Sequence, residues 1–400
     1  MREIGLITLA RVIVIACQLI NIKLFTNYLT ASQIGLYFFF LTISYFANAL
    51  IFGPVDYYQQ ANLRKTIDAT GGVFPLLSFN LKLIRYYCLI LILTIFAGML
   101  FLPQFTYHII FAGTLAVALY ATQAFRSTLN NLDHKKDVSF NLVQEAVLKI
   151  ITLLLLIEYF PPSELLLMAA WLITLITSAM TLYLKASKYG LFICNEKQVI
   201  QAKEVFYFSC PISVGAVANW VQLQGYRLIL VPLGFAEVVG IFATVASIGS
   251  AGMAAAATIF SQAFSPNIYK TSGKYTSTYL KNAALLTGSI LLVAIVAGKL
   301  IVTLATNPIF EPYWSVMLFG VLMDGSNLVI GAFAVHITLT SSTKKIMNSS
   351  FVGVIALLLS FSILFFTKNI NAFTIGVPLV LSQLFVSAYM YWNFRKCSTQ

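Results

Sequence analysis

The sequence predicts an all-α protein of about twelve transmembrane helices, arranged as two parallel-repeat six-helix bundles around a central cavity. Three observations lead to this prediction: the composition, the spacing of apolar runs and an internal repeat. The chain has 400 residues, of which 59% are hydrophobic and only 10% are charged, with a mean hydropathy of +0.86. Such a chain is too apolar for a water-soluble domain and too poor in charge to be disordered.

Apolar runs separated by charged, Pro, Asn or Gly clusters mark the expected helices, because a span needs about 20 apolar residues. The expected helices cover residues 4–25, 36–57, 86–102, 107–128, 138–159, 164–184, 205–231, 238–262, 283–305, 313–338, 350–366 and 372–393. The connections between them are too short to hold a soluble domain, and the sequence has no phosphate-binding loop motif. The five cysteines are scattered without a C-x-x-C pair, so no metal site is expected.

The distribution of positive charge predicts the orientation. If both termini lie on one side, most of the 25 Lys and Arg residues lie on that side, and Lys23 and Lys368 lie on the other. The positive-inside rule then places both termini in the cytoplasm. Topology accounts for the net charge of +12, so we expect membrane lipids rather than nucleic acid as charged partners.

Two similar segments indicate the repeat. TASQIGLYF (Thr30–Phe38) follows the first expected helix and FAEVVGIFA (Phe235–Ala243) follows the seventh, at an offset of 205 residues. An even number of helices precedes the second copy, so both halves have one orientation, as in transporters built from parallel repeats. We therefore predict an N-terminal six-helix bundle (1–190), a cytoplasmic linker (191–204) and a C-terminal six-helix bundle (205–400).

The motif L-T-x-x-x-x-G-x-Y (Leu29–Tyr37), its echo in the second half and the segment QAFSPNIYK (Gln262–Lys270) carry a resemblance. With twelve helices and short loops, the chain resembles Wzx-type O-antigen and polysaccharide flippases of the multidrug, oligosaccharidyl-lipid and polysaccharide exporter superfamily. The resemblance implies alternating-access transfer of an undecaprenyl-diphosphate-linked oligosaccharide, an O-antigen or capsule repeat unit, from the cytoplasmic to the periplasmic leaflet. It also implies a multi-pass location in a bacterial inner membrane and partners among other polysaccharide assembly proteins.

A lipid diphosphate needs a cationic, hydrogen-bonding path through the membrane, and Arg suits this task because it binds phosphate bidentately and stays charged. In the first half, Arg11 lies seven residues before Gln18, so both face the same side of one helix. Asn48 adds a polar group on the next helix. We expect these three residues to bind substrate, although Arg11 could instead extend its side chain to cytoplasmic phosphates.

In the second half, Asn219, Gln222 and Arg227 form a corresponding polar stripe and are also expected to bind substrate. Arg227 could equally extend towards the outer membrane surface. Many relatives place an acidic residue directly before this Arg, whereas Tyr226 stands here, so the ion pair implied by the resemblance is in doubt.

Three intramembrane acids have different expected roles. Glu145 and Lys149 are four residues apart in the orientation that favours a helical ion pair. Asp324 has no cation within a turn on its own helix, so it is the candidate for coupling to protons or sodium, with a structural hydrogen-bonded role as the alternative. Asp56 is expected at the cytoplasmic end of the second helix. No cofactor is expected other than such a coupling ion.

Two other function classes compete with the flippase. A gradient-driven multidrug exporter would have a related architecture but an acidic cavity. An intramembrane polysaccharide polymerase or ligase would need a sizeable periplasmic loop, and the longest outer connection expected here has about twelve residues. We therefore expect a transporter and not an enzyme.

Overall fold

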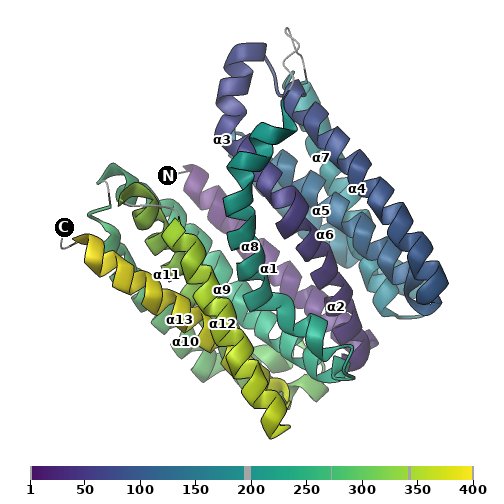
Figure 1. Ribbon diagram of the computed structural model, residues 1–400. Coiled ribbons are helices and arrows are strands. Elements are labelled where there is room, and N and C mark those ends of the chain that lie inside the picture. Colours follow the sequence, from purple (N-terminus) through teal and green to yellow (C-terminus); the bar gives the residue numbers. More distant parts are fainter. Residues whose placement is uncertain (1, 193–199, 272, 341–343, 399–400) are drawn as a thin grey trace. The chain divides into compact units, whose positions relative to one another are not determined.

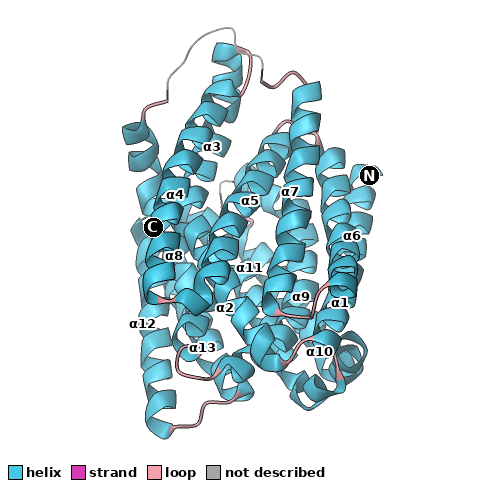
Figure 2. Cartoon of the chain, turned by 90° about the vertical axis from the view of Figure 1, so that its right-hand side faces the viewer, coloured by secondary structure: helices cyan, strands magenta, loops and turns pink. Residues whose placement is uncertain are grey.

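The computed structural model describes residues 2–192, 200–271, 273–340 and 344–398, and all regular structure in these ranges is helical (Figure 2). Long apolar runs joined by short connections explain this, because backbone groups within a bilayer must be satisfied inside each helix. The helices in chain order are α1 (Arg2–Tyr28), α2 (Ala31–Ala47), η1 (Asn48–Phe52), α3 (Gly53–Thr70), α4 (Phe74–Phe101), η2 (Pro103–Phe105), α5 (Thr106–Asn131), α6 (Lys135–Tyr159), α7 (Glu164–Lys188), α8 (Ala202–Leu230), α9 (Ala236–Lys270), α10 (Thr276–Ala305), η3 (Pro308–Val316), α11 (Met317–Thr340), α12 (Lys344–Thr367) and α13 (Ala372–Ser398).

Within the described ranges, 11 helical segments are long and apolar enough to cross a membrane. Helix α8 is not among these segments, although it has 29 residues. The predicted class, a polytopic all-helical membrane protein, is therefore confirmed.

The second predicted helix is much longer than expected. Helices α2, η1 and α3 have 17, 5 and 18 residues and follow each other without a break (Figure 1). At 1.5 Å per residue they extend about 60 Å, twice the hydrocarbon thickness of a bilayer. Asp56 therefore lies within a continuous helix, and its predicted position at a helix end is wrong.

A π-helical turn explains why Pro54 does not end this helix. Proline lacks an N–H donor and its ring collides with the carbonyl four residues earlier in a regular α-helix. Here the turn before it is widened, and the Gly53 N–H donates to the Asn48 carbonyl five residues back. A π-turn of this kind accommodates the ring without a chain reversal.

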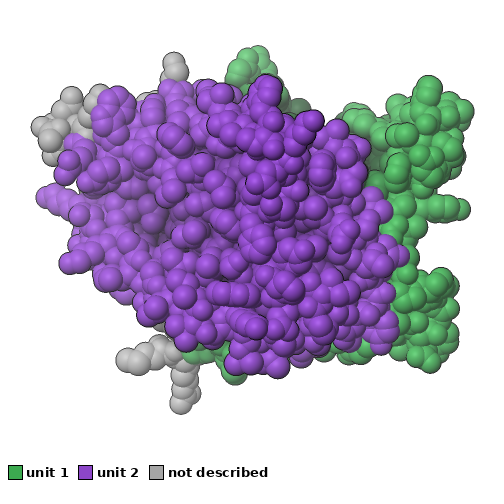
Figure 3. Space-filling view, turned by 90° about the horizontal axis from the view of Figure 1, so that it is seen from below, with its two compact units in different colours: residues 1–17, 39–216 green, residues 18–38, 217–400 purple. Residues whose placement is uncertain are grey.

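Contacts divide the chain into two compact units. Unit 1 comprises residues 1–17 and 39–216, and unit 2 comprises residues 18–38 and 217–400 (Figure 3). This division differs from the predicted bundles 1–190 and 205–400, because residues 18–38 group with the second half and residues 205–216 with the first. Half of the predicted linker 191–204, residues 193–199, lies outside the described residues.

The two repeat segments explain why residues 18–38 belong to unit 2. A Cβ atom built on Gly35 would lie 1.9 Å from the Ala236 carbonyl oxygen, and one on Gly240 would lie 1.9 Å from the Ala31 carbonyl oxygen. Ala31 and Ala236, like Gly35 and Gly240, are 205 residues apart. The repeat segments therefore pack on each other reciprocally, and only glycine permits so close a backbone approach.

A second pair of contacts has the same offset. In unit 1 the Ser44 hydroxyl on α2 donates to the Ala112 carbonyl on α5 at 2.8 Å. In unit 2 a Cβ atom on Gly249 of α9 would lie 2.1 Å from the Met317 carbonyl oxygen at the start of α11. Both partners are displaced by 205 residues, so the predicted repeat extends through two helices of each half.

Candidate functional sites

The most strongly connected polar cluster of unit 1 joins α5, α6 and α7. The Arg126 guanidinium donates to the Glu145 carboxylate at 2.6 Å and to the Asn141 side-chain oxygen at 2.7 and 2.8 Å. The Ser178 hydroxyl on α7 donates to the same Asn141 oxygen at 2.9 Å. The cluster neutralises an intramembrane acid with a cation from a neighbouring helix.

This cluster corrects the predicted Glu145–Lys149 ion pair. Glu145 binds Arg126, and the Lys149 ammonium instead lies 4.4 Å from the centre of the Trp171 ring. Two features favour this outcome: a guanidinium forms a shorter, better-directed contact to a carboxylate, and an indole face attracts an ammonium group. Sequence analysis missed Arg126 and Asn141, although Asn141 and Glu145 are four residues apart and therefore share a helix face.

A second buried acid of unit 1, Asp56, is held by neutral donors. Its carboxylate accepts hydrogen bonds from Ser127 at 2.7 Å, Gln60 at 2.8 Å and Gln123 at 3.3 Å. The residue is only 3% exposed. Three donors from α3 and α5 compensate for the loss of water around the carboxylate.

The predicted substrate residues of the first half lie in different surroundings. Arg11 on α1 is half-buried, and no carboxylate of a described residue lies within 4 Å of it. Gln18 is exposed on the same helix but belongs to unit 2. Asn48 opens the π-turn, where its amide donates to the carbonyls of Ser44 and Ala116 at 3.2 and 3.0 Å. These bonds tie α2 to α5, so Asn48 has a packing role in this structure.

In the second half, Gln222 and Asn219 differ in burial. Gln222 is 1% exposed; its amide donates to the Ser350 carbonyl at 2.9 Å, and its oxygen accepts from Ser382 at 3.1 Å and Gln383 at 3.3 Å. It therefore connects α8 with α12 and α13. Asn219, on the same helix, is exposed.

Arg227 is half-buried between aromatic rings. Its guanidinium carbon lies 5.0 Å from the Phe38 ring centre and 5.4 Å from that of Tyr226, whose hydroxyl accepts from Nε at 3.0 Å. All three residues belong to unit 2. Tyr226 therefore binds the guanidinium through a neutral hydroxyl and a ring face.

Asp324, the predicted coupling residue, lies on α11. Its carboxylate accepts a hydrogen bond from the Asn327 amide at 3.4 Å, and the Ser250 hydroxyl on α9 donates to the Gly320 carbonyl of the same helix α11 at 3.4 Å. No group of three or more His, Cys, Asp or Glu side chains that could hold a metal ion occurs among the described residues. The site therefore offers one carboxylate and neutral oxygens, a set that could accept a proton or a weakly held monovalent cation.

Known structures show which fold these helices form. A multidrug resistance MATE family transporter of the MOP superfamily in an outward-facing conformation matches with a TM-score of 0.70 at 12% identity, covering 99% of this chain and 96% of that chain. The chain adopts the fold of MATE transporters. An inward-facing conformation of such a transporter matches at 0.63 and 10% identity, covering 98% of both chains.

A further similar structure shows that polarity varies within this fold. A MOP superfamily transporter from Pyrococcus furiosus, whose binding pocket is described as having reverse polarity, matches at 0.63 and 11% identity, covering 99% of this chain and 95% of that chain. No family model and no curated protein matches the sequence. The likenesses therefore establish the fold, and the finer resemblance to Wzx-type flippases is not confirmed.

Proposed function

We propose that this chain is a membrane transporter that works by alternating access and carries an anionic amphiphile. More specifically, we propose that it moves an undecaprenyl-diphosphate-linked oligosaccharide to the periplasmic leaflet of a bacterial inner membrane. The fold supports transport, because similar structures include outward-facing and inward-facing conformations of one transporter family. Both termini would be cytoplasmic.

The observation that supports an anionic cargo is an excess of intramembrane cations in unit 1. Glu145 is neutralised by Arg126, whereas Arg11 and Lys149 have no carboxylate of a described residue within 4 Å. A cation within a membrane is costly unless it is compensated, so a site with such groups favours a negatively charged ligand. A diphosphate would supply the missing charge, with Arg as its strongest partner.

A multidrug-type exporter is the second candidate, and the similar structures favour it over the flippase because two of them are described as conformations of a multidrug resistance transporter. Cationic drugs would need exposed acids. In unit 1 the acids Asp56 and Glu145 are already held by donors of the protein itself. An exporter of anionic or neutral amphiphiles agrees better with these contacts.

The test compares lipid-linked glycan and drug in one strain. Deleting the gene should cause labelled lipid-linked repeat units to accumulate in the cytoplasmic leaflet without changing resistance to cationic dyes. Arg11→Gln should abolish complementation at normal protein level, whereas Arg11→Lys, which keeps the charge but loses the bidentate geometry, should retain part of it. A gene deletion that lowers dye efflux and leaves glycan export unchanged would refute the flippase and support the exporter.

A further inference from the structure

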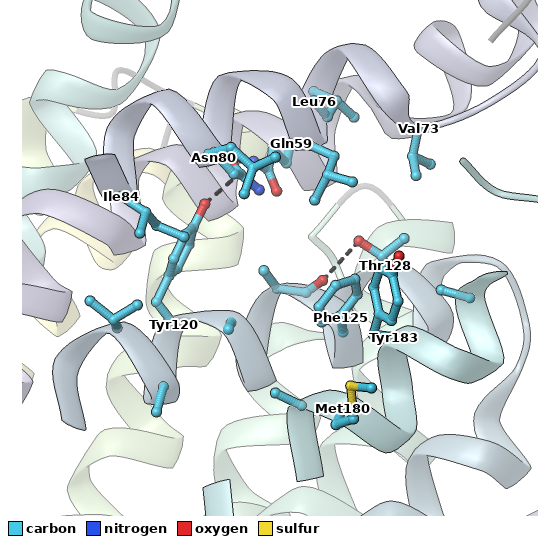
Figure 4. Close-up of a pocket in the computed structure, with 18 of the residues that line it drawn as sticks. Gln59, Val73, Leu76, Asn80, Ile84, Tyr120, Phe125, Thr128, Met180 and Tyr183 are labelled. Atoms are coloured by element: carbon cyan, nitrogen blue, oxygen red, sulfur yellow. Dashed lines mark hydrogen bonds between the residues drawn. The ribbon is translucent and has the colours of Figure 1, made fainter. Parts of the chain in front are cut away.

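Unit 1 contains a long apolar slot that none of the polar clusters above uses. It has a volume of about 810 Å³ and lies between α3, α4, α5 and α7. Figure 4 shows Val73 and Leu76 on one wall and Phe125, Thr128 and Tyr183 on the other, with open space between them. We call this cavity the unit 1 slot.

The dimensions of the unit 1 slot follow from the helices that line it. Its lining extends from Leu76 to Leu91 on α4, from Thr114 to Thr128 on α5 and from Leu172 to Ala186 on α7. At 1.5 Å per residue, each wall is about 21 Å long. The volume then corresponds to a mean cross-section of about 40 Å², which is too narrow for a helix about 10 Å across.

The chemistry of the walls indicates a hydrocarbon occupant. Leu81, Ile176 and Met180 line the slot and are 58%, 56% and 53% exposed. The polar lining residues Gln59, Asn80 and Tyr120 do not require a polar ligand, because the Gln59 amide donates to Asn80 and lies 3.5 Å from the Tyr120 hydroxyl. An apolar chain would cover the exposed side chains at no cost in unmade hydrogen bonds.

One end of the unit 1 slot is flanked by positive charge. Four exposed cations directly follow, or lie two residues after, lining residues. Lys65 and Lys188 lie at the end where α4 begins and α5 and α7 end, whereas Lys82 and Arg85 lie about 9 and 14 Å along α4 from Leu76, the first lining residue of that helix. No carboxylate of a described residue lies within 4 Å of any of the four. Clusters of this kind attract anionic lipid headgroups.

We propose that the unit 1 slot binds one acyl chain of an anionic glycerophospholipid of the surrounding bilayer, with its phosphate at this cationic end. The length agrees with this occupant: about 21 Å exceeds one leaflet of a hydrocarbon core about 30 Å thick and is shorter than the whole core. The proposal concerns a lipid held by unit 1 and does not depend on the identity of the cargo.

Tryptophan quenching by brominated lipids tests the proposal, because bromine quenches only at contact. The full-length protein, with its four native Trp residues replaced by Phe, would carry a single M180W probe in the unit 1 slot. It would be reconstituted with increasing fractions of dibrominated phosphatidylglycerol or dibrominated phosphatidylcholine. We expect half-maximal quenching at about fivefold lower mole fraction of the anionic lipid, the effect of one phosphate–cation contact.

Two comparisons make this result specific. L93W is the matched control, because Leu93 lies on α4 outside the slot lining and is 69% exposed; both lipids should quench it equally. Neutralising the cationic end with K65Q and K188Q should remove the preference at M180W. I176W provides a second probe in the slot if M180W does not fold. Equal quenching by both lipids at the slot probes, or quenching by aqueous acrylamide without lipid quenching, would overturn the proposal.

Discussion

Adding a methyl group to Gly35 or Gly240 should destabilise the protein strongly. In either case the new Cβ would lie 1.9 Å from a carbonyl oxygen of the other repeat segment, so α2 and α9 must separate by about 1 Å to relieve the collision. Overpacking of this kind costs up to about 3 kcal/mol, and alanine returns about 1 kcal/mol because it loses less backbone entropy in a helix than glycine. We expect Gly35→Ala and Gly240→Ala each to lower the free energy of unfolding by about 2 kcal/mol.

The double variant tests whether the two contacts are reciprocal. The separation that the first substitution forces also makes room for the second, so Gly35→Ala with Gly240→Ala should cost clearly less than the sum of the single effects, with a coupling energy of about 1 to 2 kcal/mol. The measurement is equilibrium unfolding in detergent micelles, followed by circular dichroism for the four members of the cycle.

Gly252→Ala is the matched control, because Gly252 lies on the same helix α9 and a Cβ there meets no atom within 4 Å. It should be neutral or stabilise the protein by up to about 1 kcal/mol. Additive single effects would show that the contacts are independent, and single variants as stable as Gly252→Ala would refute the close approach itself.

Four further substitutions test side-chain contacts through the free energy of unfolding. Arg126→Gln should lower the free energy of unfolding by about 3 kcal/mol, because it leaves the Glu145 carboxylate unpaired. The double change with Glu145→Gln should recover part of this loss in thermal denaturation. No recovery would contradict the ion pair. Lys23→Met should lower the free energy of unfolding by about 1 kcal/mol, since the Lys23 ammonium binds the Thr306 carbonyl at the end of α10. The measurement is unfolding in urea, and an unchanged free energy would exclude this cap. Gln222→Leu should lower the free energy of unfolding by about 2 kcal/mol, because it leaves the hydrogen-bond partners of Gln222 unsatisfied. Asn219→Ala should change the same free energy by no more than about 0.5 kcal/mol. Equal effects of the two substitutions in the same assay would argue against the buried amide network.

The sequence predicted the helical class and the repeat because both depend on local features. Apolar runs of membrane length form helices in almost any context, and the glycine of each repeat segment has apolar neighbours of similar kind in sequence. Gly249 also begins the run GSAGMAAAA, which continues to Ala257, and such runs of small residues let another helix approach closely.

Features that depend on other helices were not predictable in the same way. The continuity of α2 with α3 requires the π-turn before Pro54, which composition does not reveal. The partner of Glu145 comes from α5, 19 residues earlier in the chain, whereas the prediction considered a partner on the same helix. Gln222 carries the polar character expected of a substrate ligand, but its burial against α12 and α13 could only be known from packing.

The reciprocal contacts have an evolutionary consequence. In a two-fold homodimer, an isologous interface brings residue i of one subunit to residue j of the other and residue j to residue i. Ala31 with Gly240, and Gly35 with Ala236, have this relation within one polypeptide. A six-helix ancestor with one alanine and one glycine in its repeat segment would have made both contacts by self-association, so after gene fusion each glycine is held in place by the backbone of the other repeat segment.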